Sequence, residues 1–218
     1  NIMFKGVLLM GAGAIIYATG KSKITELGGL WKKMPITSTC FLIASLAIAG
    51  LPFSSGFASK ALVTESLTEG GYTVPYLLVT AAGVGTLLSI TLKINYFVFF
   101  GKTDKNVEVS EIPNSMSIAM ALGTIVTVFI GVFPETLYNY TTHATIVNPF
   151  TLHHILEYVA IFIGSTIPFV IYLKKMAPHD EISVDFDWFY RRPLNAFIQG
   201  ISKAIYSFML WCDKHVLC

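Results

Sequence analysis

Charged side chains are scarce in this sequence. They make up 13% of its 218 residues, about half of the ~25% usual in soluble domains. The formal net charge is only +2, so the basic excess typical of nucleic-acid binding is missing. Hydrophobic residues make up 54% and the mean hydropathy is +0.64, which excludes a disordered chain and exceeds what a soluble core of this size can bury. The composition is that of an integral membrane protein.

Patterns for redox, metal or nucleotide chemistry are also few. The cysteines Cys40, Cys212 and Cys218 are scattered, and they predict neither a disulfide framework nor a metal cluster. We find no phosphate-binding glycine loop, Cys-x-x-Cys pair or catalytic Ser/His/Asp order, so we expect no cofactor and no nucleic-acid partner. The chain opens at Asn1 within an apolar run and lacks signal-peptide features, so we expect it to be the C-terminal part of a longer protein.

Long apolar runs, in contrast, occur throughout the sequence. Five of them are long enough to cross a bilayer as helices, and they cover about 1–19, 36–67, 74–100, 116–133 and 151–173. Uninterrupted runs favour helices, because the strands of a membrane barrel would alternate. The predicted fold class is an all-α integral membrane protein with five transmembrane helices, the second of them broken, followed by a tail over 174–218.

Lys and Arg are distributed unevenly among the connecting segments. The loops after the first and third runs, together with the tail, carry twelve of them, whereas the loops at about 68–73 and 134–150 carry none. Basic residues accumulate on the cytoplasmic side of membrane proteins. We therefore expect a multi-pass protein of the plasma membrane whose C-terminus is cytoplasmic.

The tail contains an amphipathic segment after Pro193. Its apolar residues recur at helical spacing and are Leu194, Phe197, Ile198, Ile201, Ile205, Phe208 and Met209. This pattern predicts a helix that lies in the membrane interface. A helix packed on a partner subunit explains the pattern equally well.

Three basic residues, Lys5, Lys60 and Lys93, fall inside the predicted spans. A charge at the bilayer centre costs ~2.5–3.5 kcal/mol on insertion scales, so such residues are functional candidates by default. We interpret the three lysines as candidates for a proton relay. For Lys5 and Lys93 the alternative is a structural side chain that extends to the headgroups.

Lys60 follows an interruption in the second apolar run. The interruption contains Gly50, Pro52, Ser54, Ser55 and Gly56. Pro52 lacks an amide hydrogen, and either serine can cap a second half-helix, so we predict a broken helix with Lys60 about one turn into its second half. Glu65 is then a possible counter-charge or ion ligand. The alternative is a proline-kinked structural helix whose lysine reaches the membrane surface.

Histidines gather before and at the start of the fifth run. His143 precedes the run, whereas His153, His154 and Glu157 open it. A histidine with a glutamate one turn later can bind a metal or relay protons. We favour the more common interpretation, a polar edge at the membrane interface, and we assign no metal ligand from sequence.

Several short blocks together resemble a known family. These blocks are residues 4–9, 27–30, 33–35, 50–52, 55–57 and 59–60. In order and spacing they resemble the antiporter-like subunits of respiratory complex I, of Mrp-type cation/proton antiporters and of membrane-bound hydrogenases. The resemblance covers about residues 1–101, and the segment 185–191 is more similar to Mrp D-type proteins.

The resemblance implies proton translocation. It places Lys5 on a central hydrophilic axis and Lys60 at a broken helix near the terminal half-channel, while the upstream glutamate–lysine pair of the family has no counterpart in this sequence. We therefore expect a subunit of a multisubunit cation/proton antiporter that moves H⁺ and either Na⁺ or K⁺, with other membrane subunits as partners. The alternatives are a proton-pumping subunit of a complex I-like NADH dehydrogenase or hydrogenase, in which the subunit belongs to a redox enzyme, and a structural membrane anchor.

Overall fold

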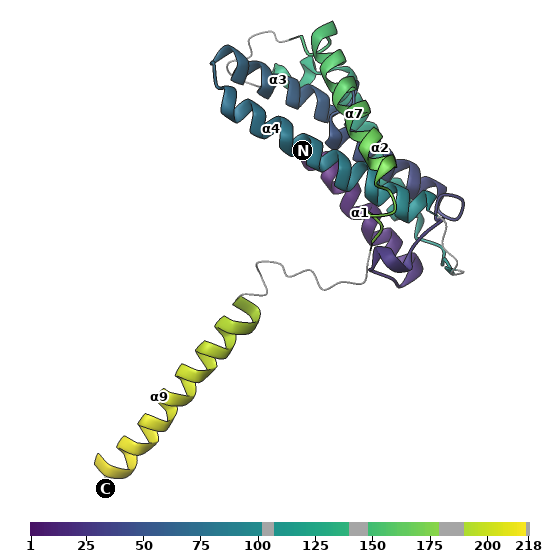
Figure 1. Cartoon of the computed structure of the whole chain (residues 1–218). Coiled ribbons are helices and arrows are strands. Elements are labelled where there is room, and N and C mark those ends of the chain that lie inside the picture. Colours follow the sequence, from purple (N-terminus) through teal and green to yellow (C-terminus); the bar gives the residue numbers. More distant parts are fainter. Residues whose placement is uncertain (102–106, 140–147, 179–189, 217–218) are drawn as a thin grey trace. The chain divides into compact units, whose positions relative to one another are not determined.

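The computed structural model describes residues 1–101, 107–139, 148–178 and 190–216 (Figure 1). It divides into two units, Asn1–Pro178 and His179–Cys218. Lys102, Lys105, His143 and most of the segment 185–191 lie outside the described residues. Within the described residues every regular element is a helix, which confirms the all-α membrane fold class.

The described residues of the first unit form nine helical elements. They are α1 (Ile2–Thr19), η1 (Ile24–Glu26), α2 (Pro35–Ala49), α3 (Ser55–Glu69), α4 (Thr73–Thr86), η2 (Leu87–Phe100), α5 (Asn114–Val132), α6 (Glu135–Tyr138) and α7 (Leu152–Ile171). Among the residues that the structure describes, four stretches are long and apolar enough to cross a membrane, namely α1, α4 together with η2, α5, and α7. The second predicted run forms two helices, α2 and α3, so the predicted break is present.

The break has a defined backbone. Gly50 ends α2 in the left-handed region with φ +86°, a conformation that glycine adopts at no steric cost. Phe53 also has a positive φ of 68°, which is uncommon for a residue with a side chain. Ser54 then caps α3, because its hydroxyl oxygen accepts a hydrogen bond from the backbone N–H of Phe57 at 3.4 Å.

Two buried glycines let neighbouring backbones approach the break closely. A Cβ on Gly56, in the first turn of α3, would overlap the carbonyl oxygen of Ala47 in α2. A Cβ on Gly131 of α5 would overlap the backbone of Ser54. Small residues at such positions are what allows close helix contact in membrane proteins. The break is therefore packed on both sides by helix backbone.

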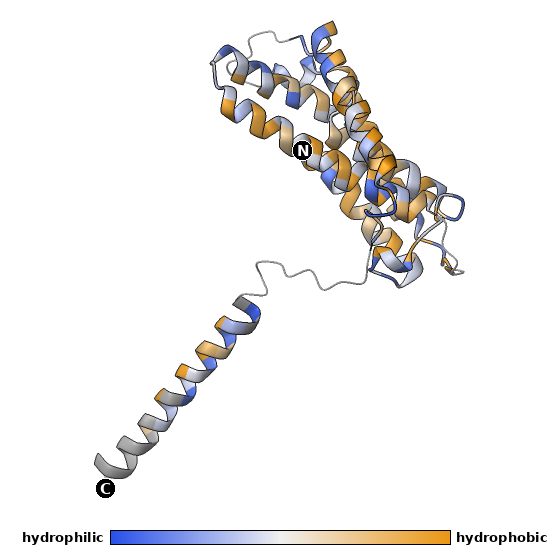
Figure 2. Ribbon diagram, viewed as in Figure 1, coloured by the Kyte–Doolittle hydropathy of each residue, from blue (hydrophilic) through white to orange (hydrophobic). Residues whose placement is uncertain are grey.

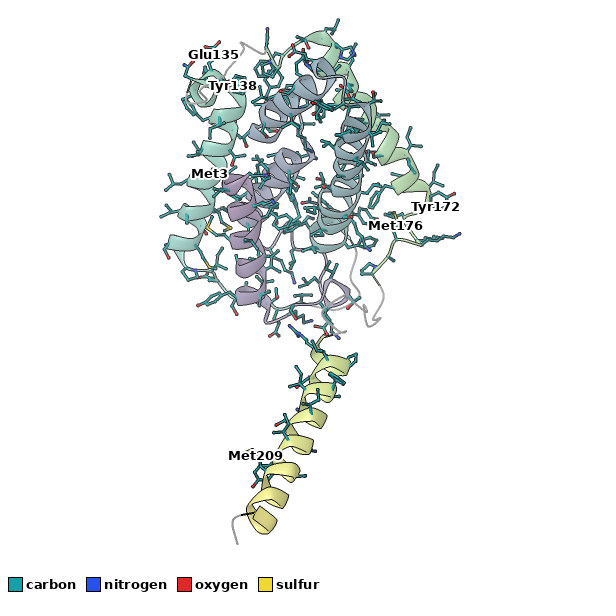
Figure 3. The ribbon with its side chains drawn as sticks, turned by 90° about the vertical axis from the view of Figure 1, so that its left-hand side faces the viewer. Met3, Glu135, Tyr138, Tyr172, Met176 and Met209 are labelled. Atoms are coloured by element: carbon teal, nitrogen blue, oxygen red, sulfur yellow. The ribbon has the colours of Figure 1, made fainter. Side chains whose placement is uncertain are left out.

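The connecting segments of the first unit gather at two ends. The loop between α1 and α2 lies at one end (Figure 1), and Glu135 and Tyr138 lie at the other (Figure 3). At the first of these ends, Leu30 N–H donates to the carbonyl of Val98 at 3.3 Å. Lys21, Lys23, Lys32 and Lys33 belong to the loop between α1 and α2 at this end, and Lys174 and Lys175 follow the last residue of α7.

The outer surface of the first unit is apolar over its long helices (Figure 2). Leu77 of α4, Ile125 of α5 and Ile163 of α7 are each more than half exposed. Such a surface fits a lipid environment.

In the second unit the described residues, 190–216, form η3 (Tyr190–Leu194) and α9 (Asn195–Val216). The helix predicted after Pro193 is thus present. Exposed apolar residues Phe197, Ile201 and Ile205 recur along it. Its location in the membrane interface stays a prediction.

Candidate functional site

Lys60 of α3 reaches back across the break to the end of α2. Its Nζ donates hydrogen bonds to the carbonyl oxygens of Ile48 at 2.9 Å and Ala49 at 3.0 Å. The last carbonyls of a helix have no partner inside that helix and carry the negative end of its dipole. The sequence predicted Lys60 about one turn into the second half-helix, and in the structure the amine of Lys60 contacts the negative end of α2.

The geometry leaves one position on the Lys60 amine for proton exchange. An ammonium group has three N–H donors, and the two carbonyls accept two of them. A neutral amine retains two N–H groups and exposes a lone pair in place of the third. Both protonation states of the amine can therefore keep the two hydrogen bonds to α2. Only the third position on the nitrogen differs, with an N–H in the charged state and a lone pair in the neutral state.

Two glycines make room for the Lys60 side chain. A Cβ on Gly50 would lie 3.0 Å from Lys60 Cδ and 3.2 Å from Tyr158 Cε1, and a Cβ on Gly83 of α4 would lie 3.7 Å from Lys60 Nζ. Lys60, Gly83 and Tyr158 also line a cavity of about 20 Å³, together with Thr64, Thr80 and Glu157. That volume holds one water molecule, which needs roughly 10–15 Å³.

A larger pocket of about 350 Å³ lies between α3, α4 and the start of α7. Thr64 and Glu157 line both this pocket and the cavity at Lys60. The Tyr76 hydroxyl donates a hydrogen bond to Glu157 Oε1. Polar groups therefore follow one another from the Lys60 amine to the end of the unit at which α3 meets α4.

The Glu65 carboxylate contacts a histidine of another helix. Its Oε2 lies 2.8 Å from His154 Nε2 of α7. The sequence suggested Glu65 as a counter-charge or ion ligand near Lys60, whereas in the structure its carboxylate contacts the His154 ring. The pair joins α3 to α7 beside the larger pocket.

Lys5 lies at about the depth at which α2 ends. Gly11 of α1 faces Phe41 of α2, and the two helices run in opposite directions (Figure 1). Lys5 lies six residues before Gly11, and Ala47 lies six residues after Phe41. Because the helices are antiparallel, Lys5 and Ala47 lie at the same depth. Met3 accordingly lies midway between the two ends of the unit (Figure 3). The Lys5 side chain is exposed on the outer face of α1.

Lys93 lies in η2 and is half-buried. Its neighbours Thr91 and Asn95 face α2, where Thr91 Oγ1 donates to the Ser45 carbonyl at 2.6 Å and Asn95 Nδ2 donates to Ser45 Oγ at 2.7 Å. Asn95 Oδ1 is buried without a partner among the described residues. Sequence reasoning missed this polar cluster, although a buried asparagine in an apolar run is a signal that points to it.

Sequence reasoning also missed the proximity of Glu157 to Lys60. It placed Glu157 in the histidine cluster, whereas the structure brings Glu157 and Tyr158 to the Lys60 cavity as well. No local pattern predicts this, because it depends on how α7 packs against α3 and α4.

Comparisons with known proteins identify a family and several relatives to which this chain is similar. Residues 2–89 match the family described as NADH:quinone oxidoreductase/Mrp antiporter, TM. The chain is 30% identical over 202 residues to NADH-quinone oxidoreductase subunit L of Rickettsia typhi, covering 84% of this chain and 31% of the relative. It is 29% identical over 162 residues to NADH-ubiquinone oxidoreductase chain 5 of Dugong dugon, and the match covers 74% of this chain and 26% of that relative. It is 38% identical over 103 residues to the same chain of Mammuthus primigenius, covering 47% and 17%. The chain thus spans less than a third of these relatives.

Proposed function

Because residues 2–89 place this chain in the NADH:quinone oxidoreductase/Mrp antiporter family, we propose that it carries protons across a membrane as one subunit of a larger assembly. The observation that carries the proposal is Lys60, held by two hydrogen bonds at a broken helix with a water-sized cavity beside it. An ionisable group at such a place is typical of proton pathways in membranes.

The driving reaction is a quinone-reducing one. The named relatives are NADH-quinone and NADH-ubiquinone oxidoreductase subunits, and this favours a complex I-like assembly over a cation/proton antiporter. The antiporter alternative, with Na⁺ or K⁺ as the exchanged ion, rests on the resemblance of segment 185–191 to Mrp D-type proteins.

Proton release follows the polar groups on one side of Lys60. The proton leaves the third position of the amine, passes through one water molecule in the 20 Å³ cavity and reaches Glu157. Glu157 borders the 350 Å³ pocket at the end of the unit that lacks the loop lysines, and this end is the outer one by the distribution of basic residues. The route uses only groups that line the cavity or the larger pocket, and Thr64 and Glu157 line both.

Lys5 and Lys93 take part by electrostatic coupling. A charge on one lysine disfavours a charge on the next, and the effect is larger in an environment of low dielectric than in water. Lys5 lies at the depth of the α2 end, where the Lys60 amine is bound. Protonation of one site therefore promotes release from the other.

Two variants of Lys60 in the intact assembly separate proton transfer from structure. Lys60→Gln keeps two N–H donors for the α2 carbonyls but does not titrate, and Lys60→Arg keeps the charge but does not release its proton. Both variants should assemble and lose proton transport in reconstituted vesicles, while Lys32→Gln in the exposed loop should behave as wild type. Wild-type transport by Lys60→Arg would overturn the proposal.

The same vesicles distinguish the two assemblies. Acidification that starts on addition of NADH and a quinone supports the complex I-like assignment. Acidification that requires a Na⁺ or K⁺ gradient, and that is indifferent to NADH, supports the antiporter.

A further inference from the structure

Three side chains that commonly bind metals gather at the start of α7. His153, His154 and Glu157 each place one ligand atom within 4.8 Å of the other two. Helix geometry explains this, since residues three and four apart lie on the same face. All three line the 350 Å³ pocket. Two imidazoles and one carboxylate are the donor set of His₂Glu zinc sites, which keep a fourth position for water.

His154 has one ring nitrogen that lacks a partner. Its Nε2 lies 2.8 Å from Glu65 Oε2, and its Nδ1 is buried without a hydrogen-bond partner among the described residues. The residue is only 7% exposed. When Glu65 accepts a hydrogen bond from Nε2–H of a neutral imidazole, Nδ1 carries the lone pair. A buried polar atom such as this Nδ1 normally has a partner. Histidine ligands of metals show this arrangement, with the second nitrogen bound to a carboxylate.

Glu157 is oriented in a comparable way. The Tyr76 hydroxyl donates to its Oε1, which leaves Oε2 to bind a cation. The third ligand, His153, is exposed and can rotate. Two ligand atoms on a tetrahedral zinc ion lie about 3.3 Å apart, given Zn–N distances of about 2.0–2.1 Å. Each of the three residues has one ligand atom within 4.8 Å of the other two, which is about 1.5 Å more than the spacing of ligand atoms on a tetrahedral zinc ion.

We propose that His153, His154 and Glu157 bind a zinc ion in this pocket, with Glu65 and Tyr76 orienting two of the ligands. The binding is independent of the proposed transport function. Its consequence for transport rests on that function, because zinc on Glu157 would block the proton route from Lys60.

The binding test uses the intact assembly in detergent. Zinc is titrated by calorimetry, and Co²⁺ serves as a visible-absorption probe of tetrahedral coordination. The variants His153→Ala and Glu157→Gln should each bind zinc at least about tenfold more weakly, and their double variant should bind one zinc fewer. Glu135→Gln, an exposed carboxylate outside the cluster, is the control and should bind as wild type. An unchanged stoichiometry and affinity in the double variant would overturn the proposal.

A second variant distinguishes a built site from chelation by surface side chains. Glu65→Gln removes the carboxylate behind His154, and loss of such a partner costs about 10–100-fold in metal affinity. Unchanged affinity in this variant would show that His154 is not a ligand and would overturn the three-ligand site. His153 is exposed, so its variant keeps the test valid if changes at buried His154 or Glu65 impair folding.

Transport measurements separate the two proposals. Zinc should inhibit proton transport in wild type and not in His153→Ala. If zinc binds as expected but transport continues, the metal site stands and the proposed proton route is wrong. Affinity should also fall as the pH is lowered, because imidazole ligands must be deprotonated.

Discussion

The surroundings of the Lys60 amine differ on its two sides. On one side are the carbonyl groups that end α2, and on the other is a cavity bordered by Gly83 and Glu157. The first side fixes the position of the nitrogen, and the second exposes it to exchange. This asymmetry allows changes on one side to be tested while the other is kept.

The variant Gly83→Ala tests the open side of the amine. Its new methyl group would lie 3.7 Å from Lys60 Nζ, an ordinary contact, so the fold should tolerate it and gain about 0.5–1 kcal/mol of helix stability. The methyl group displaces the water that the amine needs, so proton transport should fall several-fold. Vesicle transport and thermal unfolding measure the two effects.

Gly85→Ala in the same helix is the matched control. A Cβ at Gly85 meets no atom within 4 Å, so this variant should show the stability gain with unchanged transport. Equal transport rates in the two alanine variants would contradict a role for the cavity.

At the level of elements, the break between α2 and α3 depends on close backbone packing. Gly56→Ala would force a methyl group into the Ala47 carbonyl, and the backbones must separate to accept it. We expect a loss of about 1–3 kcal/mol, as for other overpacked sites, and a loss of transport because the α2 carbonyls move away from Lys60. Thermal unfolding of the purified protein measures the first effect.

The control for this substitution is Gly164→Ala in α7, where a Cβ would meet no atom within 4 Å. It should leave the unfolding midpoint at or above that of wild type. A Gly56→Ala protein as stable as Gly164→Ala would show that the crossing of α2 and α3 is looser than described.

The elements were predictable from sequence to different degrees. The break follows from local chemistry, because Gly50 and Pro52 interrupt an apolar run that is too long for one crossing. The partner of the Lys60 amine does not follow, because the chain must first turn at Phe53 before α3 lies against the end of α2. Whether a lysine meets the start of its own helix or the end of the preceding one is decided by that turn.

At the scale of the whole molecule, contacts between distant parts of the sequence limit prediction further. Glu65 and His154 are 89 residues apart in the chain, and Tyr76 and Glu157 are 81 apart. Periodicity shows which face of each helix is apolar, but it does not show which helices become neighbours. The candidate lysines were therefore identifiable from sequence, whereas the groups that surround Lys60 were not.

The distribution of lysines predicts the orientation of the first unit. Lys32 belongs to the lysine-rich end, and Glu69 ends α3 at the other. In a background without Cys212 and Cys218, a cysteine replacing Glu69 should react with an impermeant maleimide added outside intact cells. A cysteine replacing Lys32 should react only after the membrane is permeabilised.

Buried Cys40 remains in both proteins and serves as the internal control, since it should stay unlabelled. The reverse labelling pattern would place the 350 Å³ pocket on the cytoplasmic side and would reverse the direction of the proposed proton route.

The two hydrogen bonds from Lys60 to α2 also bear on inheritance. Alanine at position 60 would leave two carbonyl groups without the donor that Lys60 supplies, and a buried acceptor left without its partner costs about 1–3 kcal/mol. The protein encoded by such an allele would be degraded by cellular proteases during biogenesis, so the allele would be scored as one that lacks the protein. Alleles that encode Gln or Arg would instead give intact subunits that do not transport protons. A survey of variants at this codon would therefore distinguish alleles that cause loss of the protein from alleles that cause loss of its transport.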